Sequence, residues 1–472
     1  MCSISRWLSV ILAVGCLSGL IACNANQGTI ASPAATAPLT AAPAEAATTT
    51  SPPPSETPTW TSLPPTDTAT VTSPPPTETA TLTATSTPTS EEEIALRLGL
   101  HTALATGDRK YIVIRADFPD VQRQVSEGKL SERMLNFLNG YYSKASYQQL
   151  NFAGSMTKRY MLPHPVSYYK ISPRNLEVDR TKVLDLVNDV LNAADEDIEF
   201  TPDLYVLIAL GATNEDYGMV GYSAVPGMLG FKSDSPIVTK SGEVVNNAVV
   251  FCENAHLGTY VHDTLHMLGG VINDQRMTPC LYDHDLQAKY TGGEDWAKIL
   301  VNMGFWDPLS SHMPYDKELP PSGLSAWTKL RLGWIDPAKI ALVRPGETAT
   351  IRLDPLASED AATQVIKIPV SDSTYYLVEN RQPINSDVNL PSSGVLITFA
   401  DDTVLECRHG AAPVKIMDAN PEVPYFNDAA YDIGKQTVFL DEENNLAIVL
   451  LSKDGLTYEV KITTPDQVES AP

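Results

Sequence analysis

Residues 258–270 read Gly-Thr-Tyr-Val-His-Asp-Thr-Leu-His-Met-Leu-Gly-Gly, a segment of helix length built around His262-Asp263-x-x-His266. Residues four apart lie on the same face of a helix, so two imidazoles with this spacing can bind one metal ion. The segment therefore predicts a helix that carries two metal ligands, His262 and His266.

Asp263, which follows the first histidine, determines what such a site could do. In the H-E-x-x-H pattern of zinc proteases, a glutamate at this position is the general base. Aspartate keeps the charge but shortens the side chain by one C–C bond, about 1.5 Å. A general base must lie within hydrogen-bond distance of the proton that it takes. Asp263 is the predicted catalytic base, and the sequence leaves open whether its shorter reach impairs catalysis.

Residues 1–23 are predicted to be a bacterial lipoprotein signal peptide. Arg6 precedes an apolar run that is short for a membrane span. The run ends in Leu20-Ile21-Ala22-Cys23, which resembles a lipobox, so Cys23 is the predicted lipidation site. The alternative is an uncleaved signal anchor. Either interpretation predicts a protein outside the cytoplasm that is tethered to the membrane of a bacterial envelope.

Residues 24–90 are rich in threonine, serine, proline and alanine, and Trp60 is their only aromatic residue. A segment of this composition cannot bury enough apolar surface to offset its ordering entropy. We expect a disordered stalk that holds the folded part away from the envelope.

The chain is acidic, with 57 acidic and 33 basic residues and a formal net charge of −24. This balance argues against nucleic acid as a partner. The acidic surface is either simply solvated or binds structural Ca²⁺ through carboxylates. Downstream of Cys23 only Cys252, Cys280 and Cys407 remain. Three cysteines allow one disulfide and a free thiol, or a thiolate metal ligand.

Periodicity divides the folded part into two regions. Up to about residue 270, strands and helices alternate, which predicts a mixed sheet with helices. The predicted strands there are 111–114, 204–210 and 248–251, and the helices are 91–105, 131–142 and 184–194. Later apolar segments separated by turn residues predict strands at 348–353, 364–368, 375–379, 394–399, 447–451 and 458–462. The expected fold class is α+β, with a domain at 91–340 and a β-rich region at 341–472.

Four stretches carry a family resemblance. They are Tyr141-Tyr142-x-x-x-Ser146-Tyr147 with Leu150-Asn151-Phe152-x-Gly154; His262-x-x-x-His266-x-Leu268-Gly269; Trp306-Asp307 with Leu324 to Trp334; and Tyr376 to Arg381 with Gly394 to Ile397. In this order they resemble the immune inhibitor A family of secreted bacterial zinc metallopeptidases, over roughly residues 110–465. The resemblance implies a zincin-type catalytic domain at 91–340 that binds one Zn²⁺ through His262 and His266.

The third ligand departs from the family pattern. The family places an aspartate ligand six residues after the second histidine, where this chain has Ile272, which cannot bind metal. If residues 271–278 are an insertion, Cys280 in Pro279-Cys280-Leu281-Tyr282-Asp283 falls at the ligand position, and thiolate is a good zinc ligand. The alternative third ligand is Asp274, with Asp283 and His284 as further rivals. A disulfide between Cys252 and Cys280 would exclude Cys280.

Two other features of such a site have candidates further along the chain. Met313 is a candidate for the methionine turn beneath a metzincin metal, with ordinary core packing as its alternative. Tyr282 or Tyr315 is a candidate oxyanion donor.

Three functions are consistent with the sequence. The first is an envelope-anchored extracellular zinc metalloendopeptidase that hydrolyses proteins or peptides through a metal-activated water. The second is a catalytically impaired relative that binds peptides or proteins through the same cleft. The third is an adhesive or structural surface lipoprotein that binds Ca²⁺.

Overall fold

The structure, a computed structural model, describes residues 90–224, 236–289, 302–312 and 319–468. The predicted signal peptide, its lipidation site Cys23 and the stalk up to residue 89 lie outside these residues, as do Met313 and Tyr315. No helix among the described residues is long and apolar enough to cross a membrane.

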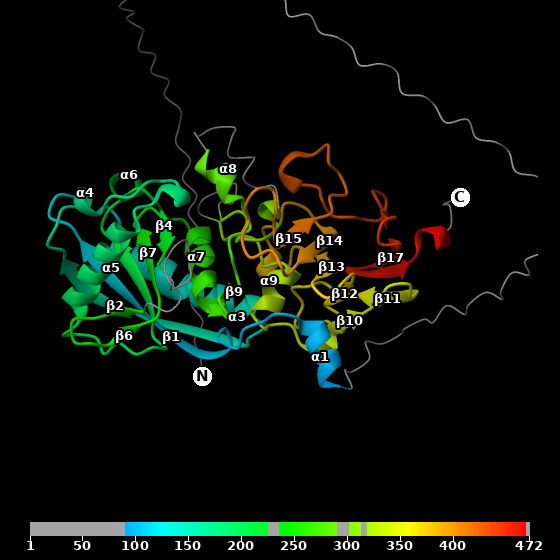
Figure 1. The fold of residues 1–472 in the computed structure, drawn as a ribbon, viewed down its shortest axis with the longest axis horizontal. Helices are drawn as coiled ribbons and strands as arrows, with labels where there is room; N and C mark the ends of the chain where they lie inside the picture. The colour runs from blue at the N-terminus through cyan, green and yellow to red at the C-terminus, as the bar shows by residue number, and fades with distance from the viewer. Residues whose placement is uncertain (1–89, 225–235, 290–301, 313–318, 469–472) are drawn as a thin grey trace, which may run out of the picture. The chain divides into compact units, whose positions relative to one another are not determined.

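A five-stranded mixed sheet forms the first region, in the order β2-β1-β3-β7-β4 (Figure 1). Four strands are parallel: β1 (Gly107–Asp117), β2 (Leu150–Met161), β3 (Tyr205–Leu210) and β7 (Ala248–Cys252). The edge strand β4 (Gly221–Ser223) runs antiparallel to β7. The predicted strands at 111–114, 204–210 and 248–251 are confirmed.

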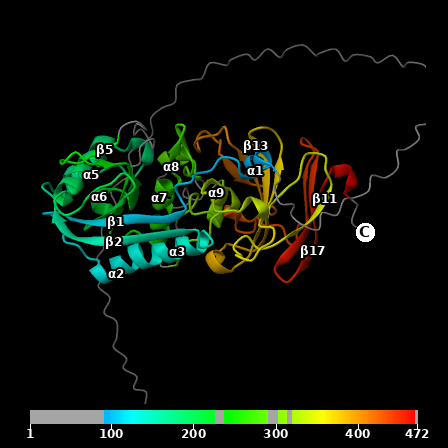
Figure 2. The ribbon, with the colours of Figure 1, turned by 90° about the horizontal axis from the view of Figure 1, so that it is seen from below.

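Helices cover both faces of this sheet. On one face lies a continuous helical stretch of α2 (Glu127–Ser131), the π-helix η1 (Glu132–Phe137) and α3 (Leu138–Ala145), together with α7 (Leu257–Gly269). On the other face lies α5 (Arg180–Ala194) (Figure 2), which buries one apolar stripe. Because the inner strands are covered on both faces, every residue of β3 and β7 is buried, which accounts for their unbroken apolar sequences.

The second region consists of two sheets that pack face to face. The first has the order β10-β12-β13-β14-β15, and the second has the order β11-β18-β17-β16. Their strands are β10 (Ile340–Leu342), β11 (Ala349–Leu353), β12 (Val365–Pro369), β13 (Thr374–Arg381), β14 (Gly394–Asp401), β15 (Val414–Ile416), β16 (Val438–Asp441), β17 (Leu446–Asp454) and β18 (Thr457–Thr463). The α+β class and the β-rich C-terminal region are therefore confirmed.

The first of these sheets has both faces buried, and alternate residues face different interiors. In β13, Leu377 packs into the same core as α7 and the five-stranded sheet, whereas Val378 faces the second sheet. Leu396 and Ile397 in β14 divide in the same way. The two regions on either side of residue 340 thus share one hydrophobic core.

A buried polar centre joins segments that are distant in the sequence. Arg381 is fully buried and donates to Asp387 (2.8 Å), to the carbonyl oxygen of Trp306 (3.1 Å) and to that of Gly323 (3.0 Å). Asp307 accepts hydrogen bonds from Ser325 N (2.9 Å), Ser325 Oγ and Thr328 Oγ1 (both 2.7 Å). These bonds fix the start of α9 (Ala326–Arg331), whose N-cap is Ser325.

The chain enters this structure through α1 (Glu91–Leu98), which is shorter than the predicted helix and ends before Gly99. Arg97 is buried and donates to the carbonyl oxygens of Ile340 (2.6 Å) and Pro337 (3.1 Å), so that α1 is attached beside β10. The remaining helices and strands are α4 (Val166–Tyr169), α6 (Asn214–Tyr217), β5 (Ile237–Val238), β6 (Val244–Val245), β8 (Val271–Ile272), β9 (Gln275–Arg276) and α8 (His284–Ala288), with short 3₁₀ turns such as η2 (Asn175–Glu177).

Candidate metal centre

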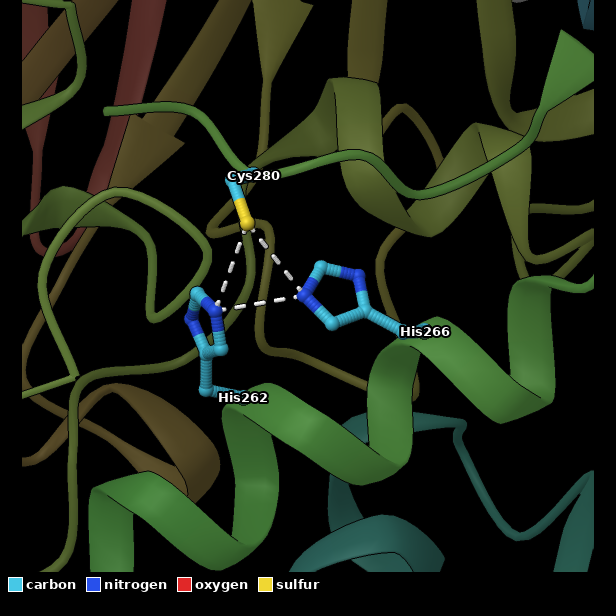
Figure 3. A group of neighbouring side chains, drawn as sticks. All are labelled: His262, His266 and Cys280. Atoms are coloured by element: carbon cyan, nitrogen blue, oxygen red, sulfur yellow. Dashed lines mark hydrogen bonds between the residues drawn. The ribbon is translucent and has the colours of Figure 1, made fainter. Parts of the chain in front are cut away.

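Helix α7 presents His262 and His266 on one face, as their spacing predicts, and Cys280 approaches them from the segment after the helix (Figure 3). All three side chains are buried. Among the described residues, they form the one group of three such side chains close enough to share a metal ion. Within the described ranges, no group of three carboxylate side chains lies close enough together to share an ion.

A hairpin brings Cys280 to the helix. The chain leaves α7 through β8, turns at Asn273 and Asp274 and returns through β9. Both turn residues have positive φ angles, of 51° and 61°, the backbone of a two-residue type I′ turn that asparagine and aspartate tolerate. The hairpin occupies the predicted insertion at 271–278, and the chain that follows it reaches the two histidines.

The donor atoms have the spacing of a small tetrahedral site. The Nε2 atoms of His262 and His266 are 3.2 Å apart, and Cys280 Sγ lies 3.7 Å from the first and 3.5 Å from the second. Bond lengths of about 2.05 Å to nitrogen and 2.3 Å to sulfur in a tetrahedron require about 3.3 Å between nitrogens and about 3.6 Å between nitrogen and sulfur. The three side chains therefore fit a tetrahedral ion such as zinc.

Backbone carbonyls orient both imidazoles. His262 Nδ1 lies 2.8 Å from the carbonyl oxygen of Pro308, and His266 Nδ1 lies 2.6 Å from that of Thr278. A carbonyl oxygen only accepts, so each Nδ1 carries the hydrogen and each neutral ring directs the lone pair of Nε2 toward the other. Such carbonyl partners are typical of metal-binding histidines. Two lone pairs at 3.2 Å repel each other unless a cation or proton lies between them.

Burial keeps the histidines neutral. Desolvation lowers the pKa of His262 to about 4 and that of His266 well below its usual value, so protons do not compete for Nε2 near neutral pH. Desolvation also raises the pKa of the Cys280 thiol to about 12. Two neutral imidazole nitrogens and a buried sulfur atom form a site that favours the binding of a cation. The cation would in turn stabilise the deprotonated thiolate form of Cys280.

Asp263 lies beside the donor group but outside it. Ser223 in β4 donates from Oγ to Asp263 Oδ1 at 3.1 Å. The other oxygen, Oδ2, lies against Gly221, where an added Cβ atom would be only 2.2 Å from it. The glycine thus makes room for the carboxylate between α7 and the sheet edge. Burial raises the pKa of Asp263 to about 7.

These side chains line a pocket that opens to solvent. Its wall also includes Asn175, Tyr222, Tyr282 and His312. Asn175 Nδ2 donates to the hydroxyl oxygen of Tyr282 at 2.7 Å, and the Tyr282 hydroxyl also makes a side-chain hydrogen bond with Cys280. The ring of His312 lies 4.9 Å from that of His262.

The predicted residues are brought together in part. His262, His266 and Cys280 meet, whereas Asp274 lies in the hairpin turn, and Asp283 caps α8 by accepting from two backbone amides. His284 is buried beside Tyr282 and is not one of the three donors. Cys252 is a free thiol that donates to the carbonyl oxygen of Met219, so the alternative disulfide with Cys280 is not formed.

Four residues were not singled out from the sequence as site residues: Ser223, Tyr222, Asn175 and His312. Each comes from a short strand, 3₁₀ turn or loop without periodicity, and only the fold places it beside α7. The histidine at 312 was the nearest to a signal, because it follows the Trp306-Asp307 stretch.

No model of a known protein family matches this chain, and no curated protein is significantly similar to it. What the site can do chemically must therefore be inferred from its own geometry. A buried group of two histidines and one cysteine can bind a metal ion, and it stands beside a carboxylate in an open cavity.

Proposed function

We propose that this chain is an extracellular zinc-dependent endopeptidase with a zincin-type catalytic domain, held at the bacterial envelope by a lipid on Cys23. The observation that carries the proposal is the convergence of His262, His266 and Cys280 beside the carboxylate of Asp263. The resemblance of four sequence stretches to the immune inhibitor A family supports it. The expected substrates are extracellular proteins or peptides.

His262, His266 and Cys280 would hold the ion as neutral nitrogen and thiolate donors. When bound there, Zn²⁺ supplies a Lewis acid that polarises a carbonyl group and lowers the pKa of water, with one position left for that chemistry. Zinc is preferred because tetrahedral coordination by mixed nitrogen and sulfur donors is typical of it.

Asp263 would act as the general base. Its Oδ1 accepts the hydrogen bond from Ser223, which leaves Oδ2 to take a proton from water. The same carboxyl group would then give the proton to the leaving amine. Burial alone raises the pKa of this carboxyl group above its usual range, and the charge of a bound Zn²⁺ would lower that pKa again and favour the carboxylate that accepts the proton.

Tyr282 would stabilise the oxyanion of the tetrahedral intermediate. Asn175 donates to its hydroxyl oxygen, and the hydroxyl is held toward Cys280 by a second hydrogen bond, so it points into the cavity beside the donor group. A hydrogen-bond donor fixed in this way before reaction costs little reorganisation when charge develops.

One observation favours a second function, peptide binding without efficient turnover. Asp263 is one methylene shorter than the glutamate of the protease pattern, and Ser223 holds it toward β4. If that position is too far from the reacting water, the cavity would bind peptides and release them unchanged.

The test combines metal analysis with cleavage of casein by the full-length chain. We expect one zinc ion per chain and cleavage that a chelator abolishes and zinc restores. Asp263→Asn should keep the zinc and lose about 10²–10⁴-fold in rate. Asp274→Asn is the matched control, because it removes a carboxylate in the hairpin turn and should change neither quantity.

Stoichiometric zinc with no chelator-sensitive cleavage would eliminate the peptidase and leave the binding function. Absence of any stoichiometric transition metal would eliminate both and favour an adhesive or structural role.

A further inference from the structure

The loop between β14 and β15, residues 402–413, belongs to the β-rich region but lies against the segment that carries Cys280. We call it the β14–β15 loop. The proposed function gives it no role. Its contacts concentrate on residues 275–285, the stretch that begins in β9 and ends in α8.

Hydrogen bonds attach this loop just beyond Cys280. The backbone amide of His284 donates to the carbonyl oxygen of Cys407 at 3.0 Å. The amide of Gly410 donates to Asp283 Oδ2 at 3.1 Å. The two stretches are thus joined by main-chain groups and not only by long side chains.

Ion pairs reinforce the attachment on both sides of Cys280. Arg408 pairs with Asp285 at 2.9 Å, and the amide of His409 donates to the same carboxylate at 2.8 Å. Before Cys280, Arg276 pairs with Glu406. Arg276 is buried, so this pair is screened less by solvent than a surface pair.

A second connection reaches the residue next to Cys280. Asn302 is buried and donates from Nδ2 to the carbonyl oxygen of Leu281 at 2.7 Å, while its own carbonyl oxygen accepts from the amide of Ile416 in β15 at 3.0 Å. The strand that ends the β14–β15 loop therefore also supports the ligand segment.

The three donors differ in what fixes them. His262 and His266 lie on a helix that is packed into the shared core. Cys280 lies between β9 and α8, in backbone without helix or strand. Its position therefore depends on what the segment is attached to: Thr278 Oγ1 donates to the carbonyl oxygen of Leu265 in α7, the amide of Leu281 donates to that of Leu309 (both 2.8 Å), and the β14–β15 loop holds the residues beyond.

We propose that the β14–β15 loop is a positioning element of the metal centre and holds the Cys280 thiolate in place. Arg408 and Glu406 are its positioning residues, acting through Asp285 and Arg276. The inference rests on the metal centre of the proposed function and does not require peptide hydrolysis. Supporting groups of this kind typically change metal affinity by about 10–100-fold.

The test is Co²⁺ binding by the full-length chain, followed through the thiolate-to-cobalt charge-transfer band and through competition with a chelating dye. Arg408→Ala and Asp285→Asn should each raise Kd by about 10-fold or more and weaken the band per bound ion. Arg408→Lys, which keeps the charge, should recover part of both. Arg352→Ala is the matched control. It removes an exposed arginine of β11 that pairs with Asp354 at 3.8 Å, and it should change neither the Kd nor the charge-transfer band.

Unchanged Kd and band in both Arg408→Ala and Asp285→Asn would overturn the proposal. If alanine at 408 unfolds the chain, Asp285→Asn and Glu406→Gln give the same two readings without loss of side-chain volume. Cys280→Ser tests whether Cys280 is a ligand at all. A full charge-transfer band in that variant would show that it is not, and would refute this inference. The casein assay with Asp263→Asn would still test the peptidase proposal separately.

Discussion

Two residues of the edge strand β4 position the carboxylate of Asp263. Ser223 donates to one carboxylate oxygen, and Gly221 leaves space for the other. The orientation of the predicted base therefore depends on β4, which has only three residues.

Gly221→Ala tests this dependence. The new Cβ atom would lie 2.2 Å from Asp263 Oδ2 and 2.7 Å from Thr259 Cγ2, so the carboxylate or the strand must move. We expect casein cleavage to fall by about 10²-fold or more while zinc content is unchanged, since a misplaced base loses most of its contribution. Gly140→Ala, an exposed helical glycine with nothing near its Cβ position, is the control and should leave cleavage intact. Equal rates for the two variants would show that Oδ2 takes no part.

Lys329 gives stability a dependence on pH. It is buried in α9, where Nζ donates to the carbonyl oxygen of Ala145 at 2.7 Å and lies 4.0 Å from the centre of the Tyr147 ring. Burial lowers the pKa of Lys329 to about 7. The carboxylates of Asp387 and Glu379 oppose this shift, and the positive charge of Arg381 adds to it.

An unfolded lysine keeps its proton to about pH 10.4. Between pH 7 and that value, the unfolded state binds more protons than the folded state, so stability rises with pH. Relative to Lys329→Met, the free energy of unfolding of the natural chain should rise from pH 7 to pH 9, by at most about 1.4 kcal/mol per pH unit. Denaturant unfolding at several pH values measures the difference, and a constant or shrinking difference would contradict the prediction.

At the scale of elements, the polar centre around Arg381 should be among the most sensitive positions. Its guanidinium and the carboxylates of Asp387 and Glu379 are all buried. Arg381→Met would leave both carboxylates without their cation and should destabilise the fold by about 3–5 kcal/mol. Arg352→Met on the exposed face of β11 should cost less than about 1 kcal/mol. Denaturant unfolding of the two variants checks the contrast, which similar losses would refute.

Hydrophobic periodicity predicted the helices and strands that bury a regular apolar face. The apolar stripe of α5 and the uniformly apolar β3 are where the pattern placed them. Strand β2 was not predicted, because this edge strand alternates poorly and exposes residues such as Lys158 and Arg159, while its pairing with β1 uses backbone groups. The π-turn in η1 likewise has no separate signature in the helical pattern.

The sequence predicted those parts of the site whose residues lie close together along the chain. His262 and His266 follow from a four-residue spacing on one helix. Cys280 required the guess that residues 271–278 form an insertion, and the sequence could not exclude Asp274. Asp285 and Arg408 are 123 positions apart, and no local pattern relates them.

For the whole molecule, the shared core has a thermodynamic consequence. Since Leu377 and Leu396 of the β-rich region pack into the core that holds α7, neither region can unfold without exposing the other. We expect one main calorimetric transition for the full-length chain. Two well-separated transitions would contradict this.

Removal of the metal should lower the midpoint temperature of that single unfolding transition. An ion present at about 1,000 times its Kd contributes about 4 kcal/mol of stability. A chelator should therefore shift the transition of the natural chain downward, but should not shift that of His262→Ala, which lacks a donor. An equal shift in both would place the stabilising ion elsewhere.

The attachment of α1 beside β10 also determines where a mechanical load enters the molecule. Tension applied through the chain at Ser90 meets α1 first, and the bonds from Arg97 to Ile340 and Pro337 bear it before β1 does. The lipid anchor proposed at Cys23 would apply such tension whenever the protein engages a fixed target. The strain would then pass into the β-rich region through β10 before it reaches β1 and the five-stranded sheet.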